Sequence, residues 1–556
     1  MGKERSILGR RNPQHALCDV PVWAQGLIAA LDTFHVHMGA FWSRVSQDAD
    51  LAAMYHARQG RPSIPPSLLS GVLILQYVDD LSDREAADRV RFDLRWKLAL
   101  GLPLDDGGFD FSTLSRFRSR LSAHGAERYA FDKLLQLAIA AGFLRPDGEH
   151  VIDSTPMHGA AALQDTYTLV RNGLRKLLLA MGADDPARRR LAKRLKLSQY
   201  LPNRKPELDW GDPVARQAHL QELVAAAERL LREARAARLP EGSEAQGAQA
   251  LLEQILAQDI TDDDGQPTIR RGVATDRVIS TVDPEMRHGR KSASTRFDGY
   301  KGHIAADPES ELITEVTVTP ANTYDGEAEE TLLDAQQAHH GLQPRAVVGD
   351  QAVVDAQRRH LLATRGIEAV GKVTPHRPEG RYAKADFAVD VAAGRVTCPA
   401  GHTVRESRAK VDGAGATWRV FTFPREVCAG CPRRAPCTTA TRTGRTISLH
   451  PDEALLQEAL ARQQSPGFRK RYHRARATVE RIISHLTRHG LRQGRYVGRA
   501  KTLFQALWVA AAVNLQRLMG LICARDGAKA LGMGTWRGRK APPVAPRGIR
   551  IVTLGS

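Results

Sequence analysis

Three acidic residues in this chain of 556 residues stand where they could bind divalent metal ions. Asp153 ends the short apolar run EHVID, Asp350 ends the run PRAVVGD, and Glu480 lies in a strongly basic segment. Carboxylate oxygens are the ligands that a hard ion such as Mg²⁺ prefers. Two such ions, roughly 3.5–4 Å apart, activate the attacking oxygen and stabilise the leaving oxygen of a phosphodiester. Phosphoryl transfer is therefore the chemistry that these acids would serve.

Glu480 gives the strongest local signal of the three. It is the only acid between Pro466 and Lys501, a stretch with eleven basic residues. These are Arg469, Lys470, Arg471, Arg474, Arg476, Arg481, Arg488, Arg492, Arg495, Arg499 and Lys501. Tyr472, Arg476 and Glu480 are four residues apart, which predicts that they share one stripe of a helix. A glutamate paired to nearby arginines is the plain alternative, but it does not explain why there is only one acid, so we favour a metal ligand.

The two aspartates depend on the strands that would position them. Strand signals in residues 300–307 and 311–319 flank a short turn and predict a hairpin. A helical pattern follows, then the apolar run before Asp350, a second helix and the strand-like IEAVGKV, so the sequence predicts an α/β fold with a mixed sheet. Taken singly, either aspartate is more often a polar strand end than a ligand. A pair on adjacent parallel strands is more persuasive, and the small Gly349 allows a close approach to the backbone.

The predicted catalytic region spans residues 146–525, and other segments precede, interrupt and follow it. Residues 1–145 are predicted to be helical, with a capping box from Ser82 to Glu85, and fit either a DNA-binding or a dimerisation domain. A helical insertion is expected at 160–275; its basic run 187–196 is best explained as a solvated helix face, with DNA contact as a minority interpretation. The acidic run near 259–267 is interpreted as a loop. Residues 526–556 form a predicted flexible basic tail.

Four of the six cysteines cluster between residues 398 and 437. Cys398, Cys428, Cys431 and Cys437 could supply four thiolates to a structural zinc ion, with His402 as an alternative ligand. The alternative is four reduced cysteines in a small β subdomain. Only one CxxC pair is present and the other spacings are irregular, but the pattern slightly favours zinc in an insertion at 380–450. Four protein ligands would close such a site, so it would not be catalytic.

The net charge of +18, from 80 Lys and Arg against 62 Asp and Glu, favours a polyanionic partner. Composition alone does not decide between such a partner and a generally basic composition, because basic proteins are common in some genomes. No apolar stretch is predicted to span a membrane, and no apolar run follows the basic N-terminus as a secretory signal would require. The sequence thus predicts a protein that stays in the cytoplasm.

Several passages, in addition to the three acids, resemble the DDE transposases of bacterial insertion sequences. They are SDREAADRVRFDLRWKLALGL, FDFSTLSRFRSRL, DPEMRHGRKS, FDGYKGHIAAD, VTVTPANTYD and CPAGHT, which occur in family order over most of the chain. The resemblance is closest to the eleven-eighty-two group, within the broad IS-four and IS-five-like DDE superfamily. It implies an RNase H-like catalytic core, two Mg²⁺ or Mn²⁺ ions on Asp153, Asp350 and Glu480, and cleavage followed by direct joining of the 3′-hydroxyl to target DNA.

The same resemblance implies DNA contacts and a likeness to the family's Tyr-Arg-Glu-Lys signature. Tyr472 stands one residue further from Arg476 than in that signature, and the lysine position holds Thr487, with Arg488 beside it. Lys301 and His303, next to glycines, could face DNA or form the polar side of a hairpin. Handling two transposon ends suggests a homodimer. An inactive DNA-binding descendant and a metal-dependent nuclease without strand transfer are the rival functions.

Overall fold

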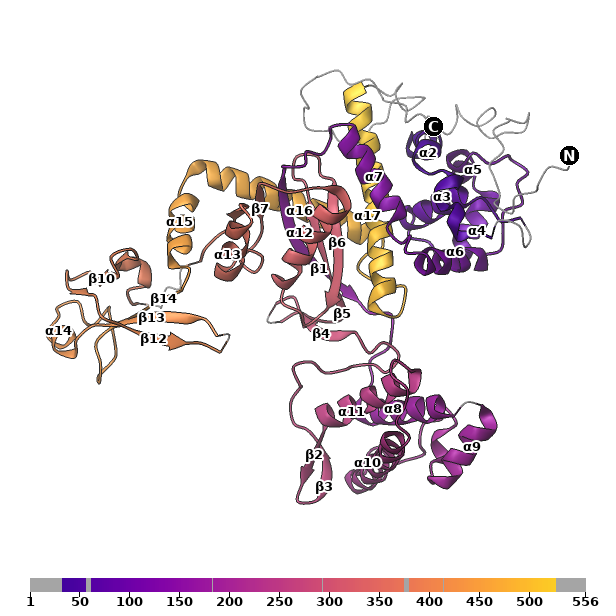
Figure 1. The fold of residues 1–556 in the computed structure, drawn as a ribbon, viewed down its shortest axis with the longest axis horizontal. Coiled ribbons are helices and arrows are strands. Elements are labelled where there is room, and N and C mark those ends of the chain that lie inside the picture. Colours follow the sequence, from indigo (N-terminus) through magenta and orange to yellow (C-terminus); the bar gives the residue numbers. More distant parts are fainter. Residues whose placement is uncertain are drawn as a thin grey trace.

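A central sheet with helices on both faces carries three arms, made of the N-terminal helices, a helical lobe (residues 166–269) and a cysteine-rich lobe (residues 380–450) (Figure 1). This computed structural model describes residues 33–56, 62–182, 184–292, 294–374, 380–413 and 415–526. The predicted basic tail lies outside the described residues except for Asp526. The architecture is mixed α/β, as the alternation of strand and helix signals predicted.

Six strands form the central sheet. They are β1 (Glu149–His158), β4 (Arg287–Arg290), β5 (Arg296–Ala306), β6 (Ile313–Pro320), β7 (Ala346–Val348) and β8 (Glu368–Val370). Their order is β4-β5-β1-β7-β8, and β6 also pairs with β5. The β5–β6 pair is antiparallel, which confirms the predicted hairpin, and β5 is antiparallel to β1. By contrast, β7 runs parallel to β1 and β8 runs parallel to β7. The three parallel strands therefore end at the same side of the sheet.

Helices cover the two faces of this sheet. One face packs on α12 (Glu327–His340) and α13 (Ala356–Thr364) through a cluster that includes Ile152 and Val347. The other face packs on α16 (Pro466–Arg488) and α17 (Arg499–Asp526) through a larger cluster that includes Val151 and Val348. Because neighbouring residues of a strand point to opposite faces, membership of these clusters fixes the face to which every side chain of β1 and β7 points.

The last helix, α17, crosses the core of the molecule. Of the described helices, it alone has the length and hydropathy of a membrane span, a feature that the sequence analysis missed. Most of its apolar window, 83%, is buried inside the protein, which identifies it as a core helix. Trp508 of α17 lies in one cluster with Tyr77, Phe131 and Val316, so the end of the chain joins the N-terminal helices to the sheet.

The N-terminal arm is helical, as predicted. Its elements are α2 (Thr33–Val45), a short 3₁₀ helix (Asp48–Met54), α3 (Pro66–Val78), α4 (Asp83–Phe92), α5 (Leu94–Leu100), α6 (Ser112–Ala123) and α7 (Tyr129–Ala140). The predicted capping box begins α4: the Ser82 hydroxyl accepts from the Glu85 amide, and the Glu85 carboxylate accepts from the Ser82 amide. Residues 1–32 of this arm are outside the described residues.

The helical lobe has its own apolar core, which includes Leu174, Leu223 and Leu252. It is built from α8 (Thr166–Met181), α9 (Asp185–Arg194), a 3₁₀ turn (Ser198–Tyr200), α10 (Pro213–Ala236), α11 (Glu244–Asp259), β2 (Ile260–Asp263) and β3 (Gln266–Ile269). The acidic run interpreted as a loop is in fact the β2–β3 hairpin, in which only Asp264 and Gly265 form the turn. The basic run 187–196 lies mostly on the solvent side of α9 and the turn after it.

The cysteine-rich lobe consists of two small antiparallel sheets and a short helix. The strands are β9 (Ala388–Asp390), β10 (Arg395–Thr397), β11 (Thr403–Val404), β12 (Ser407–Val411), β13 (Thr417–Thr422) and β14 (Thr446–Leu449), and the helices at its margin are a 3₁₀ turn (Lys384–Asp386), α14 (Arg425–Ala429) and α15 (Glu453–Gln463). Its core holds only a few buried side chains, among them Phe387, Phe421 and Phe423. Such a small core contributes little stability by itself.

Candidate active site

Asp153 and Asp350 occupy equivalent positions on neighbouring parallel strands. Val151 of β1 pairs with Val348 of β7, and each aspartate follows two residues later. Asp350 comes directly after the end of β7, as the sequence predicted. Asp153 does not end its strand, because β5 continues to pair with β1 as far as His158. The aspartate instead lies where the other neighbour, β7, has ended, so the edge of β1 is open beside it.

Both aspartates belong to the face of the sheet that α16 covers. Strand alternation places Asp153 on the side of Val151, a residue of the α16–α17 cluster. The position of Gly349 shows that Asp350 points to the same face. A Cβ added to Gly349 would meet the Val353 side chain at 2.6 Å on the α13 side, so the next residue points the other way. The close approach to Gly349 expected from the sequence thus comes from the chain's own Val353.

Asp153 is largely buried, with 13% of its side chain exposed, and makes an ion pair with Arg476 of α16 at 3.0 Å. Its Oδ1 accepts a hydrogen bond from the Ser154 amide at 2.8 Å. Burial raises the pKa of the Asp153 carboxyl; Arg476 and the Ser154 amide oppose this rise, and the charge of Asp350 adds to it. Two carboxylates that share a partly buried space in this way are suited to a further cation.

Arg476 has a second nitrogen directed at the same site. Its Nη2 pairs with Asp153, whereas Nη1 is buried and has no hydrogen-bond partner in the part of the chain that the structure describes. A buried guanidinium donor without a partner is costly, so this nitrogen is expected to meet an acceptor when the protein binds its substrate. Phosphate oxygens, like those of a carboxylate, are acceptors that an arginine fork fits.

The carboxylate of Asp350 is held by the turn that follows β7. Its Oδ1 accepts hydrogen bonds from the amides of Ala352 and Val353 at 3.0 and 3.1 Å. Among the described residues it has no ion pair. Because only one oxygen is engaged, the other remains available for a ligand.

Glu480 lies two turns after Tyr472 on α16, as predicted, but it is exposed and has no ion pair or hydrogen bond among the described residues. An α-helix turns once every 3.6 residues, so residues four apart drift around its axis by about 40° per step. Tyr472 is consequently buried, Arg476 is half-buried and Glu480 faces solvent. The predicted stripe exists, but it winds from the core to the surface.

Tyr472 connects the three acids electrostatically. It stacks on Phe468 with ring centroids 5.9 Å apart. Burial raises the pKa of the Tyr472 phenol, Arg476 opposes the rise, and the charges of Asp350, Asp153 and Glu480 each increase it. The charges of all three carboxylates therefore act on the same phenol.

The three acids are not gathered tightly enough to hold a metal ion as they stand. Over the described residues, no group of three or more His, Cys, Asp or Glu side chains has a metal-binding arrangement. The donor set nevertheless fits Mg²⁺ chemically: all three candidates are carboxylates, and two of them are aligned on adjacent strands. The third, Glu480, sits on an exposed helix face.

Two of the predicted DNA contacts lie elsewhere. Lys301 and His303 alternate with Ile304, so they point to the α12–α13 face, opposite the aspartates. The Lys301 ammonium pairs with Asp325 at 2.8 Å, and His303 bonds to Thr319 at 2.8 Å while burial lowers its pKa to about 4. Both act within the hairpin and the loop that follows it. Arg488 ends α16 and is exposed.

The four clustered cysteines and His402 line one cavity of about 20 Å³ in the cysteine-rich lobe. Burial raises the pKa of the Cys437 thiol, Arg445 lowers it, and the other three thiols raise it, so all four sulfurs lie near one another. They are free thiols and do not have a metal-binding arrangement within the described residues. The structure thus brings the predicted zinc ligands together without a completed site.

Lys372 was missed by the sequence analysis, although it lies close to the carboxylates. It follows β8 at the same distance as Asp350 follows β7, since Val348 pairs with Val370. Its Nζ lies 5.3 Å from the centre of the Tyr472 ring. The signal was the motif IEAVGKV, which repeats the apolar run, glycine and charged residue of PRAVVGD.

Residues 397–519 match the family described as Transposase DDE domain, and residues 31–120 match the Transposase domain (DUF772). These two matches support an insertion-sequence DDE transposase. They imply an enzyme that acts on DNA and depends on divalent metal ions. The first match contains Glu480 and the four cysteines, whereas Asp153 and Asp350 lie outside both matches. No curated protein and no solved structure matches the chain.

Proposed function

We propose that this chain is the transposase of an insertion sequence in the eleven-eighty-two group. It binds the ends of the element, cleaves the DNA there and joins the released 3′-hydroxyls to target DNA. The observation that carries this proposal is the alignment of Asp153 and Asp350 on adjacent parallel strands, under the helix that bears Glu480 and supplies Arg476. The family matches support a transposase reaction, and the alignment supports the choice of Asp153 and Asp350 as catalytic residues.

An RNase H-like core is part of the proposal. It is supported by the antiparallel run β6-β5-β1, continued by the parallel strands β7 and β8, with helices on both faces. Ligands of such open sheets bind beyond the carboxyl ends of parallel strands. Asp153 and Asp350 occur at that end.

The proposed chemistry has two phosphoryl transfers. In the first, a water oxygen bonds to phosphorus at the element end and the P–O3′ bond breaks, which leaves a 3′-hydroxyl. In the second, this hydroxyl attacks a target phosphodiester and releases a target 3′-hydroxyl. Asp153, Asp350 and Glu480 would hold two Mg²⁺ or Mn²⁺ ions, which when bound polarise the reacting oxygens. Arg476 would donate its unpartnered Nη1 to the phosphate.

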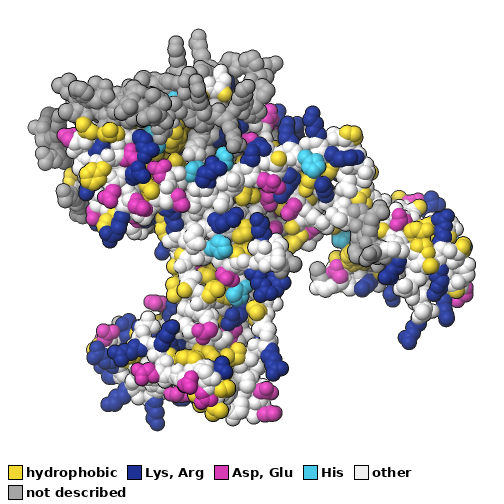
Figure 2. Space-filling model, turned by 180° about the vertical axis from the view of Figure 1, so that it is seen from behind, with side chains coloured by type: hydrophobic (Ala, Val, Ile, Leu, Met, Phe, Trp, Pro, Cys, Tyr) yellow, Lys and Arg dark blue, Asp and Glu magenta, His cyan; other side chains and the backbone are white. Residues whose placement is uncertain are grey.

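DNA is the partner that this proposal requires, and it would bring the protein to the nucleoid. The surplus of Lys and Arg supports it, and these side chains occur on each arm visible in Figure 2. Tyr472 and Arg488, on the helix of Glu480, are proposed to lie along the bound DNA. Lys301 is left out, because it is engaged by Asp325 on the other face of the sheet. A homodimer would bring two element ends together.

The test is a reaction with DNA that carries the inverted repeats flanking the gene. Purified protein, Mg²⁺ and this duplex should give a nick or break at the repeat boundary and, with a target plasmid added, joined products. Cleavage without joining would support a nuclease. Binding without cleavage would support an inactive DNA-binding descendant.

We also propose that the cysteine-rich lobe binds a structural zinc ion through Cys398, Cys428, Cys431 and Cys437. The shared cavity of the four sulfurs and the small apolar core of the lobe support it. Metal analysis of the purified chain should find about one zinc per chain. The pair Cys428→Ser and Cys431→Ser should lose it, whereas Cys523→Ser in α17 should keep it. Zinc-free protein whose thermal unfolding is unchanged by added zinc contradicts this proposal.

A further inference from the structure

One row of side chains crosses the ends of the three parallel strands. Val151 pairs with Val348, and Val348 pairs with Val370. Two residues after each of these valines come Asp153, Asp350 and Lys372. The row therefore consists of two acids and one base on adjacent strands.

The backbone keeps this row together beyond the ends of the strands. The Gly349 amide donates to the Val370 carbonyl at 3.1 Å, which extends the pairing of β7 and β8. A Cβ added to Gly371 would lie 2.8 Å from the Gly349 carbonyl and would collide with Val354 on the α13 side. Since Gly371 points towards α13, the next residue, Lys372, points to the face of α16.

The side chain of Lys372 confirms this direction. Its ammonium lies over the ring of Tyr472, 5.3 Å from the centroid, within the range of a cation–π contact. Burial raises the pKa of the Tyr472 phenol, and the charges of all three acids add to the rise. Lys372 thus lies beside the carboxylates on the same face of the sheet.

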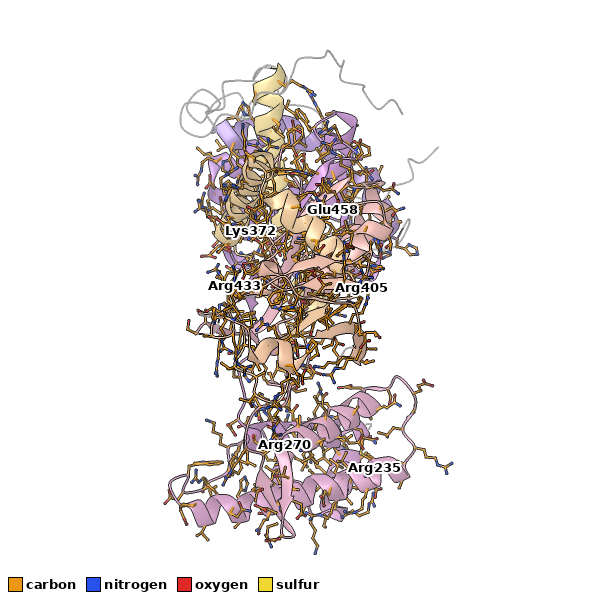
Figure 3. The ribbon with its side chains drawn as sticks, turned by 90° about the vertical axis from the view of Figure 1, so that its left-hand side faces the viewer. Arg235, Arg270, Lys372, Arg405, Arg433 and Glu458 are labelled. Carbon is orange, nitrogen blue, oxygen red and sulfur yellow. The ribbon has the colours of Figure 1, made fainter. Side chains whose placement is uncertain are left out.

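Lys372 is exposed, and among the described residues it has no carboxylate partner. It lines a groove of about 1250 Å³ between the central sheet and the cysteine-rich lobe, together with Gln351, the residue after Asp350. Figure 3 views the molecule from the side of that lobe and labels Lys372. The groove thus extends from the residue that follows Asp350 to the ammonium of Lys372.

The neighbouring cations are engaged within the protein. Arg476 pairs with Asp153, Arg471 with Glu149 and Glu368, and Arg359 donates to backbone carbonyls. Lys372 differs from them because its ammonium has neither a carboxylate nor a carbonyl partner among the described residues. An ammonium binds phosphate as a point charge, and its three rotatable N–H donors allow many directions of approach.

We propose that Lys372 binds a DNA phosphate adjacent to the one that reacts at Asp153 and Asp350. The inference rests on the proposed function and adds a residue to it. The lysine position of the Tyr-Arg-Glu-Lys signature holds Thr487 in this chain, and Lys372 would supply a basic group from the end of β8 instead. The contact would hold the strand against the acids, which otherwise repel a phosphate until metal ions bind.

The test compares Lys372→Ala with Lys410→Ala, which removes the same charge from exposed β12. Two measurements are made on the full chain with the inverted-repeat duplex: the salt dependence of binding in EDTA and the rate of cleavage in Mg²⁺. A lost phosphate contact should reduce the slope of log K against log salt by about one. Lys372→Ala should show this reduction and cleave about tenfold to a hundredfold more slowly. Lys372→Arg should recover the slope and most of the rate.

Two results would separate this inference from the proposed function. If Asp350→Asn stops cleavage while Lys372→Ala matches Lys410→Ala in both measurements, only the role of Lys372 is overturned. If Asp350→Asn cleaves normally, the assignment of the active site itself fails. Circular dichroism of Lys372→Ala checks that the fold is kept, and the recovery by Lys372→Arg excludes a purely structural effect.

Discussion

Asp350→Asn should reduce Mg²⁺-dependent cleavage of an element end by at least about a thousandfold, while the protein keeps its fold and its DNA binding. The amide oxygen of Asn can still accept from the amides of Ala352 and Val353, so the turn after β7 is preserved. The negative charge needed by a divalent ion is lost. Cleavage of the inverted-repeat duplex, followed on a denaturing gel, measures the effect.

Asp355→Asn is the matched control for this substitution. Asp355 also accepts from a backbone amide, that of Arg358 at 2.8 Å, and begins α13 just five residues later. It does not belong to the row of strand-end side chains, so this variant should cleave within about threefold of the natural protein. Equal losses in the two variants would mean that the region is merely fragile, and cleavage retained by Asp350→Asn would remove that residue from the active site.

Arg128→Ala should destabilise the protein by about 3–5 kcal/mol. Arg128 precedes α7 and forms two hydrogen bonds, at 2.9 and 3.0 Å, with Glu315 of β6. Only 1% of the Glu315 side chain is exposed, so loss of the arginine leaves a buried carboxylate without its counterion. Urea unfolding followed by tryptophan fluorescence measures the change, and the main transition should move to lower denaturant.

Arg145→Ala provides the comparison. Arg145 also pairs with a glutamate of the same hairpin, Glu309, but both side chains are more than half exposed. Such a pair contributes about 0–1 kcal/mol. The double variant Arg128→Met with Glu315→Leu should recover much of the lost stability, because it removes both charges. An Arg128→Ala protein as stable as Arg145→Ala is incompatible with a buried ion pair between α7 and β6.

Local patterns in the sequence were sufficient to predict several elements. The capping box at Ser82, the β5–β6 hairpin and the helix of Glu480 each depend on residues close together in the chain. The same holds for the apolar runs before Asp153 and Asp350. Short-range patterns of this kind carry their own hydrogen bonds or periodicity, so they survive in the folded protein.

Other features depend on contacts that no local pattern encodes. The face of the sheet to which Lys301 points is set by tertiary packing. Lys372 became visible only through the register of three strands, which joins residues some 200 positions apart. Glu480 lies on the exposed side of α16 because the helix has 3.6 residues per turn and its opposite side, which includes Val479 and Ile482, is buried in the core.

The position of α17 has a consequence for how the protein is made. The Tyr77 and Tyr496 hydroxyls lie 3.3 Å apart across 419 positions of the chain, and α17 itself fills the space between α3, α7 and β6. The apolar surfaces of the N-terminal helices therefore stay exposed until nearly the whole chain has been synthesised. A copy of the gene that has lost its 3′ end would yield an arm without its core, a species open to proteases. The N-terminal helices therefore depend on the last helix of the chain for their apolar core.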